Sequence, residues 1–302
     1  MRTRSFIMLL PIIALACGLL IVNAQGPDDD VRGAFISTRP KTTNTNARPK
    51  PRPRPQQNTN SNAAKNANTG QTNTVNANIN VTVSTNNAAS GPVSAIGLGY
   101  TLFMRDPNGR AVRVEPGHEF HSGDRVRISL EPNVDGFLYV FHTEGAGQPE
   151  MIFPDPRLNE GENWIEAHVP TEVPQSDQAD ERYHWFVFDN NPATERLYVV
   201  VTRKPLPSVP IGADLVKFCT DNKDKCPWRP LSEVWAQLQD ATKAQVRVVS
   251  SKTYGQPETE KEKAATTRGL GLDQSAPQPA VIRMTATTNA QVLVTVLELI
   301  HK

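Results

Sequence analysis

Four of the six histidines are considered as candidates for catalysis or metal binding. His118 and His121 flank Glu119, which suggests a metal site. However, residues three apart on a strand face opposite ways, so zinc would need an unusual backbone, and no third ligand stands at a suitable spacing. His142 and His184 lie inside predicted strands, where a histidine is more often a satisfied sheet residue than a catalyst. We therefore assign no metal ligands.

The sequence motifs of common enzyme classes are also absent. The chain contains no Gly-x-Ser-x-Gly elbow, no His-Glu-x-x-His pair, no Walker loop and no dinucleotide-binding fingerprint. A serine, histidine and aspartate can be chosen from almost any chain, but no motif here places such a triad. We therefore assign no catalytic residue and no cofactor.

Two of the three cysteines, Cys219 and Cys226, are close in sequence. Redox centres typically have two residues between their cysteines, whereas six residues separate this pair. The spacing favours a structural disulfide that fixes the polar loop ahead of Trp228. For so short a ring we expect it to contribute about 2 kcal/mol.

The first 24 residues have the features of a secretory signal peptide. Two arginines precede an apolar run from Phe6 to Val22, and small residues stand before the expected cleavage site at Ala24. The mature protein would then be periplasmic or secreted. The alternatives are an uncleaved anchor and lipidation at Cys17, and either would add membrane contact.

Residues 25–95 differ in composition from the rest of the chain. They contain Arg-Pro-Lys-Pro-Arg-Pro-Arg-Pro at 48–55 and a long tract of Asn, Thr and Ala with few large apolar residues. Such a segment cannot bury enough surface to offset its ordering entropy, so we predict a disordered tether that begins with a solvated acidic tail at Asp28–Asp30. Over the whole chain, 32 Lys and Arg stand against 31 Asp and Glu, which argues against a nucleic-acid partner.

Residues 96–302 contain short strands separated by turn residues, typical of an antiparallel β-sandwich or a partly open barrel. The run from Phe137 to Phe141 is apolar on both faces, as in a central strand. Residues 211–243 are predicted to be a helical insertion. Residues 245–302 are predicted to return to the same sheets through a mobile loop at 253–272 and a closing hairpin of 281–286 with 291–300.

Several strand and turn segments resemble a known bacterial family. The order Gly-Asp-Arg-Val (123–126), Asp-Gly-Phe-Leu-Tyr-Val (135–140), Ile-Phe-Pro (152–154) and Glu-Arg-Leu-Tyr-Val-Val-Val (195–201) is similar to domain of unknown function 4384, over roughly residues 100–205. The resemblance gives Gly123, Asp124, Gly136 and Pro154 turn roles. The family occurs on envelope and secreted proteins and has no agreed catalytic residues, so the resemblance implies none here.

These features together predict a non-enzymatic, exported interaction module on a flexible tether, which binds an envelope protein or polymer. A secreted or periplasmic hydrolase with an unidentified site is one alternative, and a polar, partly buried cluster with strongly perturbed ionisation would support it. A structural spacer of the cell envelope is the other. The sequence specifies no oligomeric state.

Overall fold

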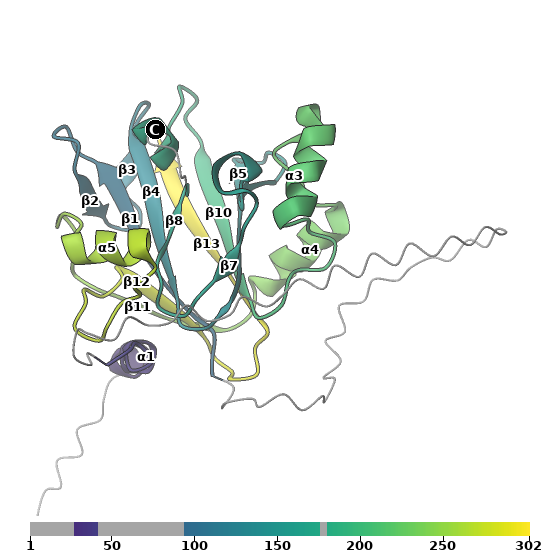
Figure 1. Cartoon of the computed structure of the whole chain (residues 1–302). Coiled ribbons are helices and arrows are strands. Elements are labelled where there is room, and N and C mark those ends of the chain that lie inside the picture. The colour runs from purple at the N-terminus through teal and green to yellow at the C-terminus, as the bar shows by residue number, and fades with distance from the viewer. Residues whose placement is uncertain (1–26, 42–93, 176–179) are drawn as a thin grey trace, which may run out of the picture.

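The computed structural model describes residues 27–41, 94–175 and 180–302. Two mainly antiparallel sheets pack face to face, which confirms the predicted β-sandwich (Figure 1). The predicted signal peptide at residues 1–24, and residues 42–93 of the predicted tether, lie outside the described residues. Within the described ranges, no helix is long and apolar enough to cross a membrane.

The first sheet has seven strands in the order β11-β12-β1-β4-β8, with β2 beside β1 and β9 beside β4. Its strands are β1 (Gly97–Arg105), β2 (Ala111–Val114), β4 (Arg125–Pro132), β8 (Thr171–Val173), β9 (Phe186–Val187), β11 (Val246–Ser250) and β12 (Val281–Thr285). The second sheet has the order β3-β13-β10-β5-β6, with β7 beside β5. Its strands are β3 (Glu119–Phe120), β5 (Gly136–Glu144), β6 (Glu150–Phe153), β7 (Trp164–Ile165), β10 (Thr194–Thr202) and β13 (Val292–His301).

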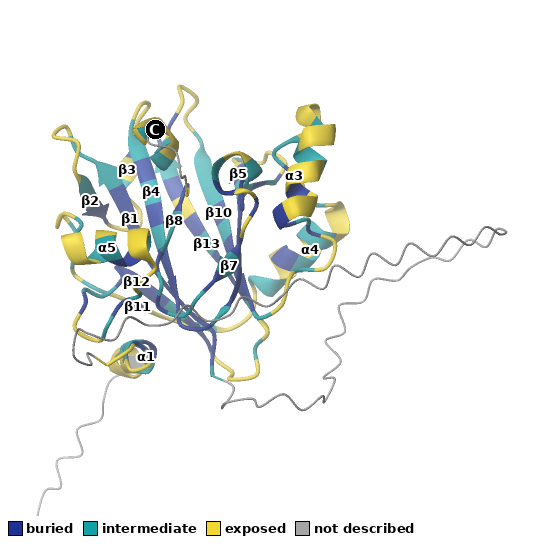
Figure 2. Ribbon diagram, viewed as in Figure 1, coloured by how far each residue is buried: buried dark blue, intermediate teal, exposed yellow. Residues whose placement is uncertain are grey.

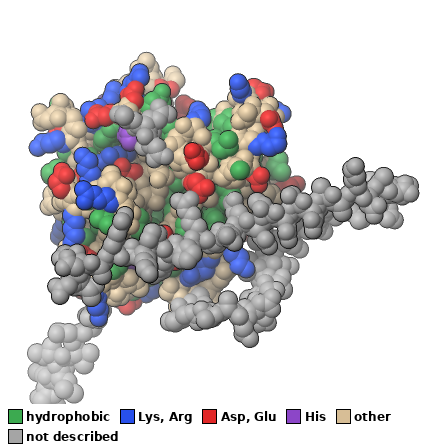
Figure 3. Space-filling model, viewed as in Figure 1, with side chains coloured by type: hydrophobic (Ala, Val, Ile, Leu, Met, Phe, Trp, Pro, Cys, Tyr) green, Lys and Arg blue, Asp and Glu red, His purple; other side chains and the backbone are tan. Residues whose placement is uncertain are grey.

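Apolar side chains at alternate positions of both sheets fill the space between them. Leu98 and Ile128 of the first sheet meet Val140 and Val199 of the second in one fully buried cluster. Figure 2 shows buried residues along the strands and exposed ones at the loops and outer helix faces. On the face drawn in Figure 3, basic and acidic side chains are interspersed, in keeping with a formal charge of +1.

Two helices cover the outer face of the second sheet (Figure 1). They are α3 (Gly212–Asp221) and α4 (Ser232–Ala241), separated by the short 3-10 helix η2 (Lys223–Lys225). Leu215 of α3 and Leu238 of α4 are buried in one cluster with Tyr139 and Phe141 of β5. The apolar run on β5 is thus covered on both faces, as a central strand requires.

A third helix, α1 (Pro27–Ile36), packs on the outer face of the first sheet. Val31 and Phe35 are one turn apart and share a buried cluster with Ile282 and Met284 of β12. The acidic residues Asp28–Asp30 lie in the exposed first turn, where negative charge complements the helix dipole. Residues 27–41 are therefore docked on the sandwich rather than forming the solvated start of a tether.

Beyond α1, the chain is held by a buried ion pair. The Arg39 side chain is fully buried and donates two hydrogen bonds of 2.7 Å to the carboxylate of Glu131 on β4. Its remaining N–H groups reach the carbonyls of Ala276, at 2.9 Å, and Pro277, at 3.1 Å. Nδ1 of His168 lies 2.7 Å from the same carboxylate. The N-terminal segment thus supplies, through Arg39, the cationic partner of the buried Glu131 carboxylate on β4.

Several predicted elements differ from the structure. Residues 253–272 contain α5 (Glu260–Arg268), which a capping box between Thr259 and Glu262 begins. His184, which was predicted to lie inside a strand, is instead the last residue of the 3-10 helix η1 (Glu181–His184), and the strand β9 follows this helix. The predicted closing hairpin is wrong, because β12 pairs with β1 and β11 in one sheet while β13 pairs with β10 and β3 in the other.

Candidate binding cleft

The side chains that face the sandwich interior change from apolar to titratable near one end of the second sheet. On β5, Leu138 and Val140 are buried between the sheets, and His142 and Glu144 continue the same face. On β10, Glu195 precedes the interior residues in the same way. Because charged groups are costly to bury without partners, the two sheets do not close over this row.

The result is a cleft of about 340 Å³ between the sheets, which we call the acidic cleft. Both sheets contribute to its lining, together with the loop after the disulfide. The lining residues are Val126, His142, Glu144, Glu150, Ile152, Arg157, Phe186, Val187, Phe188, Asp189, Glu195, Leu197, Pro227 and Leu299.

His142 is held between two carboxylates in this cleft. Its Nε2 lies 2.5 Å from Oε2 of Glu195, a diagonal neighbour on β10, and its Nδ1 lies 4.0 Å from Oε1 of Glu150 on β6. The register of β6 depends on a bulge: Val140 pairs with Phe153, but His142 pairs with Glu150. Without that extra residue in β6, Met151 would lie opposite His142, so the bulge brings the second carboxylate to the site.

The charge of the acidic cleft is predominantly negative. Four carboxylates line it, from Glu144, Glu150, Asp189 and Glu195, against one guanidinium from Arg157. The Arg157 guanidinium is itself paired with Asp155, at 2.7 Å. Hydrogen bonds from the backbone and side chain of Asn191 hold the pKa of Asp189 below its ordinary value, so this carboxyl group is ionised at neutral pH.

An apolar wall stands beside these carboxylates. Phe186, Val187 and Phe188 line the cleft from the first sheet, and the Val187 side chain is 56% exposed. The turn at Gly123 and Asp124 positions this wall: the Gly123 amide donates to Phe188 O at 2.8 Å, and the Phe188 amide donates to Asp124 O at 3.0 Å. Gly123 has a φ of +88°, which glycine adopts without strain.

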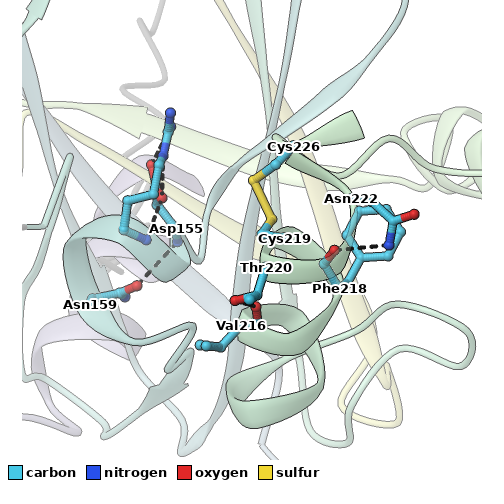
Figure 4. The surroundings of a disulfide bond; sticks show 9 residues. Asp155, Asn159, Val216, Phe218, Cys219, Thr220, Asn222 and Cys226 are labelled. Carbon is cyan, nitrogen blue, oxygen red and sulfur yellow. Dashed lines mark hydrogen bonds and ion pairs between the residues drawn. A yellow bond between two sulfur atoms is a disulfide. The ribbon is translucent and has the colours of Figure 1, made fainter. Parts of the chain in front are cut away.

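The disulfide region supplies the opposite rim. A disulfide joins Cys219 of α3 to Cys226, beside the short helix α2 (Pro156–Asn159) with its buried capping residue Asp155 (Figure 4). The chain that follows runs along β6, where the Met151 amide donates to Trp228 O at 2.8 Å. Pro227 lines the cleft, so the disulfide holds the loop from which one wall is built.

The other predicted turn residues have separate positions. A Cβ atom added to Gly136 would lie 2.2 Å from the Thr202 carbonyl oxygen, so β5 and β10 approach too closely there for any side chain. Pro154 follows β6 through a cis peptide bond and leads into α2. Gly136 and Pro154 are therefore at the ends of the strands that carry His142 and Glu150, and neither lines the cleft.

The other three candidate histidines do not line the cleft. His118 packs edge-on against Phe120, the His121 side chain is exposed, and His184 lies in η1 rather than in a strand. Among residues 27–41, 94–175 and 180–302, no group of three or more His, Cys, Asp and Glu has an arrangement that could hold a metal ion.

One carboxyl group with a strongly shifted pKa lies elsewhere, on the outer face of the first sheet. Burial, and the nearby Glu172 and Glu262 carboxylates, raise the pKa of Glu258 to about 7, although Arg127 pairs with it and opposes the shift. The cavity next to Glu258 holds only about 20 Å³, enough for about one water molecule. The carboxyl group whose pKa is strongly raised and the cleft with room for a ligand are therefore separate.

Sequence reasoning missed the residues that form the acidic cleft. His142 was predicted to be a satisfied sheet residue, and Glu150 and Glu195 were not singled out. The signal was present on β5, because two titratable residues continue an otherwise apolar interior face. The position of Glu150 beside them depends on a bulge in β6, and the sequence contains no turn residue that predicts this bulge.

Comparison with known proteins shows that most of the acidic cleft lies within a segment that matches a protein-family model. No curated protein and no solved structure matched the chain. A family model does match residues 119–205, which include every residue that lines the acidic cleft except Pro227 and Leu299. The resemblance expected from the sequence is thus confirmed over this segment, because residues 119–205 match the family described as Domain of unknown function (DUF4384).

Proposed function

We propose that this protein is an exported interaction module that binds a basic partner, an envelope protein or polymer, in the acidic cleft. The observation that carries the proposal is the pairing of four carboxylates with an exposed apolar wall in one cleft. Lysine and arginine side chains have this combination of an apolar stem and a cationic head. A basic side chain would lay its stem on Phe186 and Val187 and present its charge to Glu144, Glu150 and Glu195.

The cleft supports binding better than nucleophilic hydrolysis. No serine, threonine or cysteine of the described residues lines it, so the His142–Glu195 pair has no hydroxyl or thiol to activate there. An ion pair of 3.4 Å joins the Glu150 carboxylate to Arg229, and this arginine is largely exposed. An incoming ammonium group can displace it at small cost, because exposed ion pairs contribute little.

The experiment measures binding of a labelled Ala-Lys-Phe-Lys-Ala peptide to the chain from residue 25 onward by fluorescence anisotropy. Glu195→Gln and Glu150→Gln should each weaken binding about tenfold, which corresponds to about 1.4 kcal/mol. Glu233→Gln is the matched control, because Glu233 is exposed on α4 away from the cleft. Equal binding of a peptide with both lysines acetylated would refute the proposed charge recognition.

The hydrolase alternative predicts a different result with the same proteins. If the His142–Glu195 pair acted as a general base, His142→Ala would abolish hydrolysis of an ester or amide probe by the purified protein. Our proposal expects no turnover above background in the wild type, and expects His142→Ala to change only peptide affinity.

A further inference from the structure

The last strand, β13, has an open outer edge along much of its length. Its inner edge pairs with β10 from Val292 to Ile300, whereas β3 covers only Ile300 and His301 on the outer side. Within the described part of the chain, no other strand pairs with this outer edge. Val296 is half-buried and Glu298 is exposed, so the accessible section of the edge lies ahead of β3. An unpaired edge of this kind can accept an additional strand.

The direction of the edge amides follows from two hydrogen bonds at the end of β13. The His301 amide donates to Ala193 O on the β10 side at 3.0 Å, and the Lys302 amide donates to Phe120 O on the β3 side at 2.9 Å. Because backbone groups alternate between the two sides of a strand, the amides and carbonyls of Val296 and Glu298 point away from β10. They are positioned to pair with an extended chain.

A second cleft, of about 420 Å³, runs along this edge. We call it the edge cleft. The consecutive residues Val296, Leu297 and Glu298 line it, as expected where a cleft follows one side of a strand, and Tyr100 and Arg283 line the facing wall on the first sheet. The edge cleft shares no lining residue with the acidic cleft.

Arg283 gives the edge cleft a cationic group for which the described part of the chain supplies no anionic partner. It lies opposite Leu98 in the β12–β1 register and therefore faces the space between the sheets. Its guanidinium lies 6.0 Å from the centroid of the Tyr100 ring, and its Nε is buried with no hydrogen-bond partner among the described residues. The one carboxylate in the cleft, Glu298, pairs instead with Arg196 at 3.0 Å.

We propose that the edge cleft binds a short, extended, acidic peptide by strand addition. The peptide backbone would pair with Val296 and Glu298, and a peptide carboxylate would pair with the Arg283 guanidinium, whose planar fork suits a carboxylate. A bidentate carboxylate would supply the charge that the guanidinium lacks and could accept a hydrogen bond from the buried Nε. This site is independent of the acidic cleft, which takes a partner of opposite charge.

The test measures anisotropy of a fluorescein-labelled Thr-Val-Thr-Val-Glu peptide with an amidated C-terminus. Arg283→Gln should weaken its binding at least tenfold, since a charge-assisted bidentate contact is lost. The same variant should leave binding of the Thr-Val-Thr-Val-Gln peptide unchanged. Arg268→Gln is the matched control, because Arg268 lies exposed in the last turn of α5.

Two further measurements address the backbone pairing. Val296→Pro removes an N–H that points away from β10, so it should weaken binding about tenfold while β13 still pairs with β10. If this variant fails to fold, N-methylation of the peptide's central valine tests the same hydrogen bond from the other side. Equal binding of the Glu and Gln peptides would overturn the proposal. A concentration-dependent dimer that Val296→Pro abolishes would also overturn it, because a second copy would then occupy the edge.

Discussion

Removing the Arg39 side chain should be one of the most damaging single changes in the described structure. Its side chain is 0% exposed and that of Glu131 is 4% exposed, and two hydrogen bonds of 2.7 Å join them. In Arg39→Met the Glu131 carboxylate loses its cationic partner while it remains buried. Breaking a buried ion pair from one side typically costs about 3 to 5 kcal/mol. We expect the free energy of unfolding to fall by this amount. The loss cannot exceed the free energy that docks residues 27–41, because undocking of the segment would expose Glu131 to water.

The assay is urea denaturation together with amide hydrogen exchange. If burial of the unpaired Glu131 carboxylate costs more than the docking free energy, exchange in α1 should rise to that of an unprotected peptide while the central strands β5 and β10 remain protected. Arg32→Met is the matched control on the same segment. The Arg32 side chain is 30% exposed and lies 3.6 Å from Asp29, so its loss should cost less than about 1 kcal/mol.

A double-mutant cycle separates the ion pair from general packing. Arg39→Met combined with Glu131→Leu removes both charges, so the double variant should be more stable than the sum of the single losses predicts, by about 1 to 3 kcal/mol. Additive losses, or an Arg39→Met cost below about 1 kcal/mol, would refute the claim that this pair holds the N-terminal segment.

Three other predictions concern separate parts of the molecule. The raised pKa of Glu258, from 4.5 to about 7, means that the folded state binds a proton more tightly than the unfolded state; its stabilising contribution is full below pH 4.5 and is lost as the pH rises through 7. Relative to wild type, the free energy of unfolding of Glu258→Gln, measured in urea titrations, should therefore rise by up to about 3 kcal/mol between pH 4.5 and 7. A difference between the two proteins that does not change with pH would contradict the pKa shift. Replacing both cysteines of the Cys219–Cys226 pair by serine should lower the free energy of unfolding by about 2.5 kcal/mol for an eight-residue ring, and an unchanged midpoint in urea would contradict the role of the ring. Gly136→Ala should destabilise the protein by about 1 to 3 kcal/mol or more, because the added Cβ would lie 2.2 Å from the Thr202 carbonyl oxygen. Gly33→Ala, which has open space around it in α1, should instead stabilise the protein by about 1 kcal/mol. Similar effects of the two substitutions in thermal unfolding would contradict both expectations.

The local elements of the sandwich were predictable because their signals are local. The alternation from Arg125 to Leu130, the apolar run of β5 and the amphipathic stripe of α4 each specify one element without reference to the rest of the chain. Strand partners were not predictable in the same way. The short, polar connection between β12 and β13 suggested a hairpin, yet β12 pairs with β1 and β11 in one sheet, and β13 pairs with β10 and β3 in the other.

Two helices were missed although their signals were present. α5 begins with a Thr259–Glu262 capping box and ends at Gly269 in the left-handed conformation. α1 has acidic residues in its first turn and apolar residues at Val31 and Phe35. The polar composition around both segments outweighed these signals. The buried Arg39–Glu131 pair had no signal of its own, because its partners are 92 residues apart and only the tertiary fold brings them together.

Docking of residues 27–41 changes the topology that the sequence suggested. The described N-terminal segment ends at Lys41, and the next described residue is Ser94, whose carbonyl accepts a 2.6 Å hydrogen bond from Arg203. Residues 42–93, with their Pro-Arg and Asn/Thr tracts, are thus bounded at both ends by docked segments. Fixing both ends of a stretch of about 52 residues costs the unfolded chain about 3.5 kcal/mol plus a constant, by the logarithmic dependence of the closure entropy on chain length. The buried apolar face of α1 and the Arg39–Glu131 pair must offset this cost, which explains why a short, mostly polar N-terminal segment carries a fully buried arginine.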